Sequence, residues 1–220
     1  MTSNTTNFKT FDVGAQYTVG AEKNFPMPSY KMFILPQSFF DTAGAYQYEQ
    51  MEEFYGLYST VIADRKKVND GRHLMKGDSG FDLYLPRDVE IQPGKIEMID
   101  MNVKIALFKD IQEVWGNDTG AGAEVLKPWL IPSPYYLYAR SSVIKRGIMM
   151  VNGVGIIDKG YRGTLKAGFY NTTDEVVRIG FGERIVQVCC PDLCPYFDVE
   201  LAHKMDDTRR GTGGIGSTGR

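Results

Sequence analysis

The pattern of apolar and polar residues changes near residue 78. Over residues 42–67, apolar side chains recur at three- and four-residue spacing, which predicts a helix that packs its apolar stripe on a neighbouring surface. No sustained period is present in residues 1–23. We therefore interpret residues 1–75 as a partly helical N-terminal extension. The apolar stripe of the helix comprises Tyr48, Met51, Phe54, Tyr55, Tyr58, Val61 and Ile62.

From residue 78 onward, short apolar segments are separated by turn residues. Asn152–Gly153 stands between two of these segments and is the strongest short signal for a β-hairpin. Residues 109–134, with several glycines near their centre, are typical of a loop-like insertion. Many short strands with turn chemistry between them predict an all-β fold, a jelly-roll-like antiparallel β body over residues 76–205. The predicted strands are 83–91, 99–107, 135–139, 148–151, 154–157, 164–170, 176–179, 185–190 and 197–201.

The last fifteen residues, 206–220, have too many glycines to form a packed core. Their closely spaced backbone N–H groups, hydroxyls and arginines suit phosphate oxygens, which predicts a flexible arm that orders over a polyphosphate. The alternative is a terminal tail without a role. A dinucleotide-binding glycine motif would need a following helix, and a P-loop would need lysine where Ser217 stands, so both of those readings fail.

Composition narrows the class of protein. The chain has 220 residues, of which 43% are apolar and 24% charged, and its net charge is -2. This balance gives no electrostatic case for binding duplex nucleic acid, and no apolar run is long enough to cross a membrane. The N-terminus lacks the apolar core of a signal peptide, so we expect a protein that is not secreted.

The three cysteines, Cys189, Cys190 and Cys194, do not make a disulfide framework. A zinc site with His203 is conceivable, but Cys189 and Cys190 alternate to opposite faces of a predicted strand, which favours buried thiols. A reducing compartment, the cytoplasm or the nucleus, is the simpler expectation.

Four further stretches rich in polar and small residues lie within the β segment: 78–83, 139–142, 152–163 and 182–187. Together with the arm, and in this order, they resemble the five motifs of the homotrimeric dUTP diphosphatase (dUTPase) family. The resemblance covers residues 78–220, about two thirds of the chain. It implies hydrolysis of dUTP to dUMP and diphosphate, which keeps uracil out of DNA and supplies dUMP for dTMP synthesis.

The residues of these stretches fit a triphosphate. Guanidinium forks and neutral donors serve to position phosphates and stabilise their charge. A single arginine is more often a solvated surface charge, so the argument depends on the whole set. The set comprises Arg140, Ser141, Ser142, Arg184, Gln187 and Arg210, and the resemblance adds Gly213, Gly214, Ile215, Gly216 and Ser217 of the arm as substrate-binding residues.

The resemblance implies that Asp158 activates the water that attacks the α-phosphorus. Asn152, Gly155 and Ile156 would form the uracil slot, and Tyr161 would pack under the deoxyribose and exclude a 2′-hydroxyl. Asp82 would lie near the phosphates, and Mg2+ would be held by phosphate oxygens and water, with Asp82 at most a ligand through water. The plain alternatives are that Asp158 caps a turn and that Tyr161 is part of a sheet core.

The chain departs from the family pattern in several places. Ile215 stands where the arm usually has a phenylalanine over uracil, Lys159 and Gly160 stand before Tyr161 in place of an acidic residue, and Ala139 replaces a proline. In the family, three chains share each active site, which implies a homotrimer.

Two other functions are alternatives. dCTP deamination on the same fold would need a glutamate base in the third motif, and no glutamate occurs between residues 152 and 170. A nucleotide-gated binding protein, in which the arm acts as the switch, is the alternative from another class.

Overall fold

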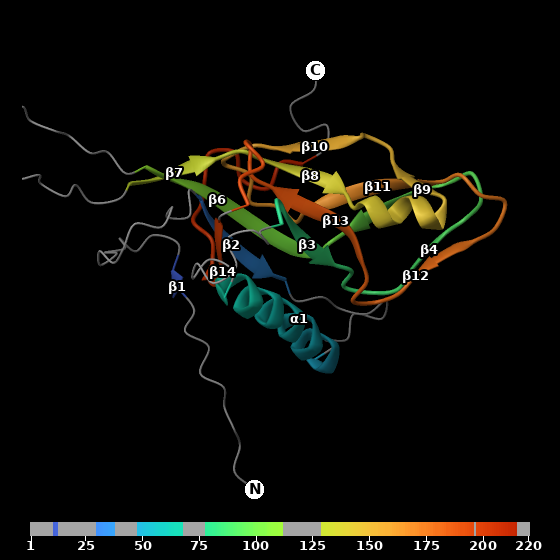
Figure 1. Cartoon of the computed structure of the whole chain (residues 1–220), viewed down its shortest axis with the longest axis horizontal. Coiled ribbons are helices and arrows are strands. Elements are labelled where there is room, and N and C mark those ends of the chain that lie inside the picture. Colours follow the sequence, from blue (N-terminus) through green and yellow to red (C-terminus); the bar gives the residue numbers. More distant parts are fainter. Residues whose placement is uncertain are drawn as a thin grey trace, which may run out of the picture.

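The computed structural model describes residues 11–12, 30–37, 48–67, 78–111, 129–195 and 197–214. Strands dominate, with one long helix and one short 3-10 helix (Figure 1). The elements are β1 (Phe11–Asp12), β2 (Tyr30–Pro36), α1 (Tyr48–Lys67), β3 (Gly80–Tyr84), β4 (Val89–Ile91), β5 (Ile96–Asp100), β6 (Val103–Ile111), β7 (Trp129–Ser133), β8 (Tyr135–Ala139), η2 (Ser141–Arg146), β9 (Ile148–Met150), β10 (Val154–Ile157), β11 (Lys166–Asn171), β12 (Val177–Ile179), β13 (Arg184–Cys189) and β14 (Phe197–Lys204).

The described strands form four sheets around one shared core. Their orders are β1-β14-β2-β6-β7, β10-β8-β13-β3, β5-β11-β9 and β12-β4. Most neighbours are antiparallel, as expected for a jelly-roll-like body, and the all-β prediction is confirmed. The pairs β14–β2 and β1–β14 are parallel, which the sequence analysis did not anticipate.

Strand β2 was not predicted at all. It lies between β14 and β6 in the middle of its sheet, and Met32 and Ile34 are fully buried. A strand covered on both sides has a continuous apolar run and shows no alternation, so the period-2 signal is absent. Part of the predicted extension 1–75 thus lies inside the β body.

The helix predicted over residues 42–67 is present as α1, and residues 42–47 lie outside the described part of the chain. The described side chains of its stripe are buried or half-buried, with Phe54, Tyr58 and Ile62 in the main core cluster. Figure 1 shows α1 lying along one side of the β body, and its contacts include β14.

Two predicted strands are each divided in the structure. The strand expected over 83–91 ends at Tyr84 and resumes as β4 at Val89. The strand expected over 99–107 is interrupted at Asn102, whose φ of 53° lies in the left-handed region, and the Asn102 N–H donates to Asp100 Oδ1 at 2.8 Å. Alternation of apolar residues continues across the second break, so periodicity alone does not reveal it, whereas Pro86, Arg87 and Asp88 interrupt the apolar pattern at the first.

The hairpin prediction at Asn152–Gly153 is half right. A turn is present there, with Gly153 at a φ of 62°. The flanking strands, however, belong to different sheets, because β9 pairs with β11 and β10 pairs with β8. The ends of the predicted insertion 109–134 also differ from a loop, since β6 reaches Ile111 and pairs with β7. Residues 112–128 lie outside the described part.

Within the described part of the chain, no helix is long and apolar enough to cross a membrane.

Candidate active site

Five of the predicted site residues lie on the sheet β10-β8-β13-β3, namely Asp82, Gly155, Ile156, Arg184 and Gln187. Asp158 follows the last residue of β10, and Ile157 of that strand pairs with Tyr135 at the start of β8. Arg140 follows the last residue of β8, where Ala139 pairs with Val186. Asp158 and Arg140 are therefore located at opposite ends of a five-residue strand, which corresponds to about 15 Å.

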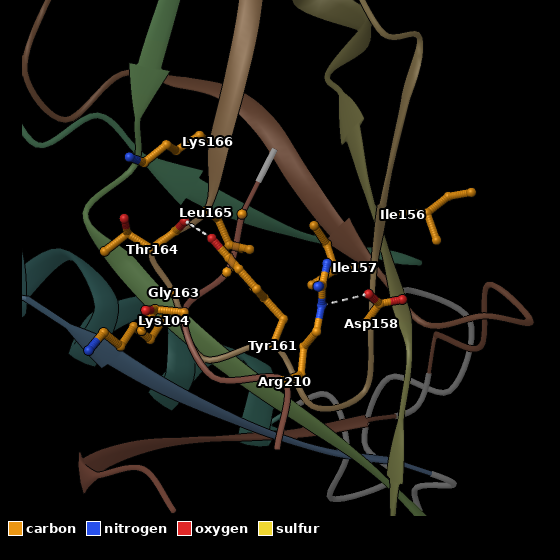
Figure 2. A pocket seen from close by; sticks show the side chains of 13 residues that line it. Lys104, Ile156, Ile157, Asp158, Tyr161, Gly163, Thr164, Leu165, Lys166 and Arg210 are labelled. Atoms are coloured by element: carbon orange, nitrogen blue, oxygen red, sulfur yellow. Dashed lines mark hydrogen bonds and ion pairs between the residues drawn. The ribbon is translucent and has the colours of Figure 1, made fainter. Parts of the chain in front are cut away.

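A first cleft, of about 690 Å³, lies at the Asp158 end. Figure 2 shows the Tyr161 ring in the middle of this cleft, with Asp158 and Arg210 on one side and Lys104 and Lys166 on the other. The structure thus brings together Asp158, Tyr161 and the root of the arm of the same chain, whereas the family resemblance implies that the arm comes from another chain. The lining also includes Ile156, Ile157, Gly163, Thr164, Leu165, Thr212, Gly213 and Gly214.

Arg210 is paired with the predicted catalytic carboxylate of its own chain. Its Nε lies 3.1 Å from Asp158 Oδ2, while the Asp158 side chain stays 60% exposed. The Arg210 N–H does not point at that oxygen in hydrogen-bond geometry, so the contact is a charge pair. The Asp158 carboxylate therefore remains accessible to water.

Tyr161 is fixed in place from two directions. Its hydroxyl donates to the Thr164 carbonyl at 2.9 Å, and burial raises the pKa of that hydroxyl, which keeps it protonated as a donor. The ring packs directly on Gly163, where an added Cβ would lie 2.6 Å from Tyr161 Cζ. Only glycine at position 163 permits this placement of the ring.

The root of the arm folds back on the loop that follows Asp158. The buried Arg162 side chain pairs with Asp206 at 3.0 Å, and its backbone N–H donates to Gly211 O at 2.8 Å. Thr208 donates to the Gly160 carbonyl. These bonds carry Gly213 and Gly214 into the cleft. The other predicted arm residues, Ile215, Gly216 and Ser217, lie outside the described part of the chain.

A second cleft, of about 580 Å³, lies among β3, β8 and β13. Asp82 on β3 is its central carboxylate: Oδ1 lies 2.8 Å from Arg140 Nε, and Oδ2 lies 3.1 Å from Arg184 Nη1. Burial raises the pKa of Asp82 above its ordinary value, and the two arginines oppose this shift. Asp82 thus holds the guanidinium groups of Arg140 and Arg184 next to each other.

The neutral donors lie around this pair of arginines. Gln187 packs on the backbone of Gly80, where an added Cβ would lie 2.8 Å from Gln187 Cδ, and its amide donates to Ala139 O at 3.4 Å. Ser141 lines the cleft at the start of η2. Ser142, in the same turn, accepts a hydrogen bond from Arg140 Nη1 at 3.5 Å. Chemically, two guanidinium groups with neutral donors around them can bind an anion.

The predicted uracil-binding residues lie along β10 and the preceding turn. Asn152 is exposed at the turn, and the Ile156 side chain is 74% exposed. Gly155 is buried against Leu137, where an added Cβ would lie 3.1 Å from Leu137 Cβ. β10 is an edge strand of its sheet, so its outer backbone groups are available to a planar ligand.

Several lining residues were missed in the sequence. Lys104, Thr164, Lys166 and Thr212 line the first cleft. Thr164 donates to Asp100 Oδ2 at 2.8 Å, and Lys166 Nζ lies 3.3 Å from the same oxygen. The strand register brings these residues together from distant parts of the chain, and no local motif marks them.

Comparison with known proteins identifies the family of this chain. A family model described as dUTPase matches residues 129–219. A deoxyuridine 5′-triphosphate nucleotidohydrolase of Cutibacterium acnes is 35% identical over 153 residues, covering 67% of this chain and 84% of the relative. The protein of the same name from Picosynechococcus is 32% identical over 145 residues, covering 66% and 86%. A crystal structure of dUTPase from Streptococcus mutans aligns with a TM-score of 0.36 and 27% identity, covering 50% of this chain and 75% of that one. On the strength of these sequence relatives, the chain belongs to the dUTPase family.

Proposed function

We propose that this protein hydrolyses dUTP to dUMP and diphosphate. The observation that carries the proposal is that the site residues form two groups. Asp158 lies with Tyr161 near one end of β8, and Arg140 and Arg184 both pair with Asp82 near the other end. The first group suits water activation beside a sugar, and the second suits a polyphosphate.

Asp158 acts as the general base. Arg210 approaches its Oδ2 atom, so Oδ1 accepts a proton from water. The water oxygen forms a bond to the α-phosphorus, the bond from that phosphorus to the bridging oxygen breaks, and diphosphate leaves with the electron pair. Positioning and charge stabilisation account for most of the catalysis, because phosphoryl transfer needs little covalent help from the protein.

The phosphates bind in the second cleft. Arg140 and Arg184 neutralise charge, while Ser141, Ser142 and Gln187 donate neutral hydrogen bonds. Asp82 orients both guanidinium groups by pairing with each of them. Two guanidinium groups that are already oriented lose less conformational entropy on binding than two mobile arginine side chains would.

Mg2+ fits this arrangement as an ion carried by the substrate. Both oxygens of Asp82 face arginines, and the described residues contain no cluster of three or more acidic, cysteine or histidine side chains that could hold a metal. Mg2+ keeps several waters and takes phosphate oxygens readily, so it needs few protein ligands. When bound, it neutralises charge on the phosphates, and Asp82 contacts it at most through water.

The nucleoside end binds in the first cleft. Asn152, Gly155 and Ile156 present the β10 edge to uracil, and Tyr161 packs under the deoxyribose. Gly213, Gly214 and the following arm residues Ile215, Gly216 and Ser217 close over the nucleotide. Discrimination against other bases comes from polar groups that would be left unpaired.

A homotrimer completes the site. The two clefts are about 15 Å apart along β8 of one chain, which is too far for Asp158 to serve a phosphate chain held by Arg140 of the same chain. A neighbouring copy can bring its own second cleft to the first cleft. We also place the protein in the cytoplasm or nucleus, in keeping with its cysteines at 189, 190 and 194, none of which is joined in a disulfide.

The test is a diphosphate-release assay over dUTP, dCTP, dTTP and UTP, with and without Mg2+. We expect turnover of dUTP that depends on Mg2+, and little turnover of the other three. The Asp158→Asn variant should keep its affinity for a non-hydrolysable dUTP analogue and lose most of kcat. Release of diphosphate from UTP at the same rate as from dUTP would contradict the proposed specificity.

A further inference from the structure

The long helix α1 reaches the phosphate-binding end of the β body, although it lies outside the residues 129–219 that match the family model. Its inward face packs on β3, which carries Asp82, and on the turn that leads into Arg184. Three separate contacts connect the helix to this region, and each one lies near Asp82 or near a residue that lines the second cleft or pairs with Asp82.

Tyr58 makes the first contact. This side chain is fully buried, and its hydroxyl accepts a hydrogen bond from the Tyr84 backbone N–H at 3.1 Å. The ring stacks on Phe81 with a centroid distance of 6.3 Å and meets Tyr84 edge-on at 5.3 Å. Phe81 and Tyr84 lie on either side of Asp82 in β3, so Tyr58 holds the strand both before and after the carboxylate.

Arg65, in the last turn of α1, makes the second contact. Its Nη2 donates to the carbonyls of Asp78 at 2.6 Å and Pro195 at 2.7 Å, and its guanidinium lies 3.6 Å above the Phe197 ring. Burial lowers the pKa of Arg65 to about 10, so the side chain remains charged at neutral pH. Asp78 lines the second cleft and leads directly into β3.

The third contact is on the side of β13. Phe54 packs on Phe181 at 6.3 Å, and Leu57 Cδ1 lies 3.5 Å from the position that a Cβ on Gly182 would take. The turn at 181–183 leads into Arg184 and is bonded to the end of β3, because the Leu85 N–H donates to Glu183 O at 2.8 Å. The helix therefore supports both partners of the Asp82–Arg184 pair.

We propose that α1 is a positioning element for the triphosphate, with Tyr58 and Arg65 as its positioning residues. They fix β3 so that Asp82 keeps Arg140 and Arg184 at the spacing that the phosphates need. This inference rests on the proposed function for the identity of the phosphate ligand. Tyr58 and Arg65 touch no substrate, and they act through the backbone of β3.

The test compares two variants of one helix that undergo the same chemical change. Tyr58→Phe removes the hydroxyl that accepts from Tyr84 and keeps the ring. Tyr55→Phe is the matched control, because the Tyr55 hydroxyl donates to Pro36 O at 2.9 Å, on β2 and away from β3. For each full-length variant we would measure KM and kcat with dUTP, the Kd for inorganic tripolyphosphate, and the Tm.

Tyr58→Phe leaves the Tyr84 N–H unpaired, and we expect roughly a tenfold weaker Kd for tripolyphosphate and a matching rise in KM. Tyr55→Phe should lower Tm without changing either constant. An unchanged Kd in Tyr58→Phe, or an equal change in both variants, would overturn the inference. A merely structural role would lower Tm or the active fraction and leave Kd and KM unchanged.

A double-mutant cycle gives a second test that does not depend on turnover. In an Asp82→Asn background the Asp82 carboxylate no longer orders the arginines, so Tyr58→Phe should weaken tripolyphosphate binding little further. If the two substitutions weakened tripolyphosphate binding additively, Tyr58 would not act through Asp82. If the wild-type chain bound tripolyphosphate but did not hydrolyse dUTP, the proposed function would fail, and the comparison of Tyr58 with Tyr55 would still decide the positioning role.

Discussion

The packing of Tyr161 on Gly163 gives a sharp test of how the sugar is held. A Gly163→Ala substitution would place Cβ at 2.6 Å from Tyr161 Cζ and 3.0 Å from Cε2, whereas carbon atoms in contact stay 3.4 Å or more apart. The tyrosine ring must therefore move by about 1 Å. Its hydrogen bond to Thr164 O would stretch or break as it moves.

A displacement of about 1 Å in a positioning group costs roughly a hundredfold in rate. We therefore expect kcat/KM for dUTP to fall by about this factor in Gly163→Ala, and discrimination between dUTP and UTP to weaken, because the ring no longer blocks a 2′-hydroxyl. The assay is diphosphate release with each nucleotide, together with a thermal melt that shows the variant to be folded. A folded variant with wild-type kcat/KM and wild-type discrimination would refute the role of Tyr161.

Three further predictions concern stability and the phosphate end. In Gly56→Ala, nothing lies within 4 Å of the added Cβ on α1, so the free energy of unfolding should rise by about 0.5–1 kcal/mol with unchanged kinetics; a lower urea midpoint would contradict this. In Gly80→Ala, the added methyl displaces the Gln187 side chain, and KM for dUTP should rise by roughly two- to tenfold; an unchanged KM would remove Gln187 from the phosphate site. Burial raises the pKa of Cys189 to about 11, whereas a thiol in the unfolded chain has a pKa near 8.5. Because the unfolded state loses this proton first, the free energy of unfolding should fall as the pH rises from about 8.5 to about 11. Under reducing conditions, the urea midpoint should fall less between pH 8 and pH 10 in Cys189→Ala than in the wild type. An equal fall in both proteins would show that Cys189 does not cause the loss of stability.

Local patterns predicted the regular part of the fold well. β8 begins and ends at the predicted residues, because a short aromatic-rich run is bounded by Pro134 and by Arg140. β2 escaped detection, since a strand buried on both faces resembles any short apolar run. The left-handed residue Asn102 divides a strand without interrupting its hydrophobic period.

The candidate site residues could be named from the sequence through the resemblance of their motifs to a known family. Asp158 and Arg140 directly follow strand ends, and Tyr161 stands in the loop after Asp158. Their separation into two clefts depends on the register between β8 and its neighbours, which no local motif encodes. The contacts of Tyr58 and Arg65 with β3 depend on how α1 packs on the sheet. A stripe of apolar residues predicts that one face of a helix is buried, but it does not identify the strand or loop on which that face packs.

The central claim is that one chain's Asp158 works with another chain's Arg140. It can be measured by mixing two variants, Asp158→Asn and Arg140→Gln, unfolding them together and refolding them. Each variant alone should be inactive, and random mixing in equal amounts should restore about one quarter of the wild-type sites, those where an intact Asp158 meets an intact Arg140 across an interface. Mixed assemblies that stay as inactive as the separate variants would contradict the account.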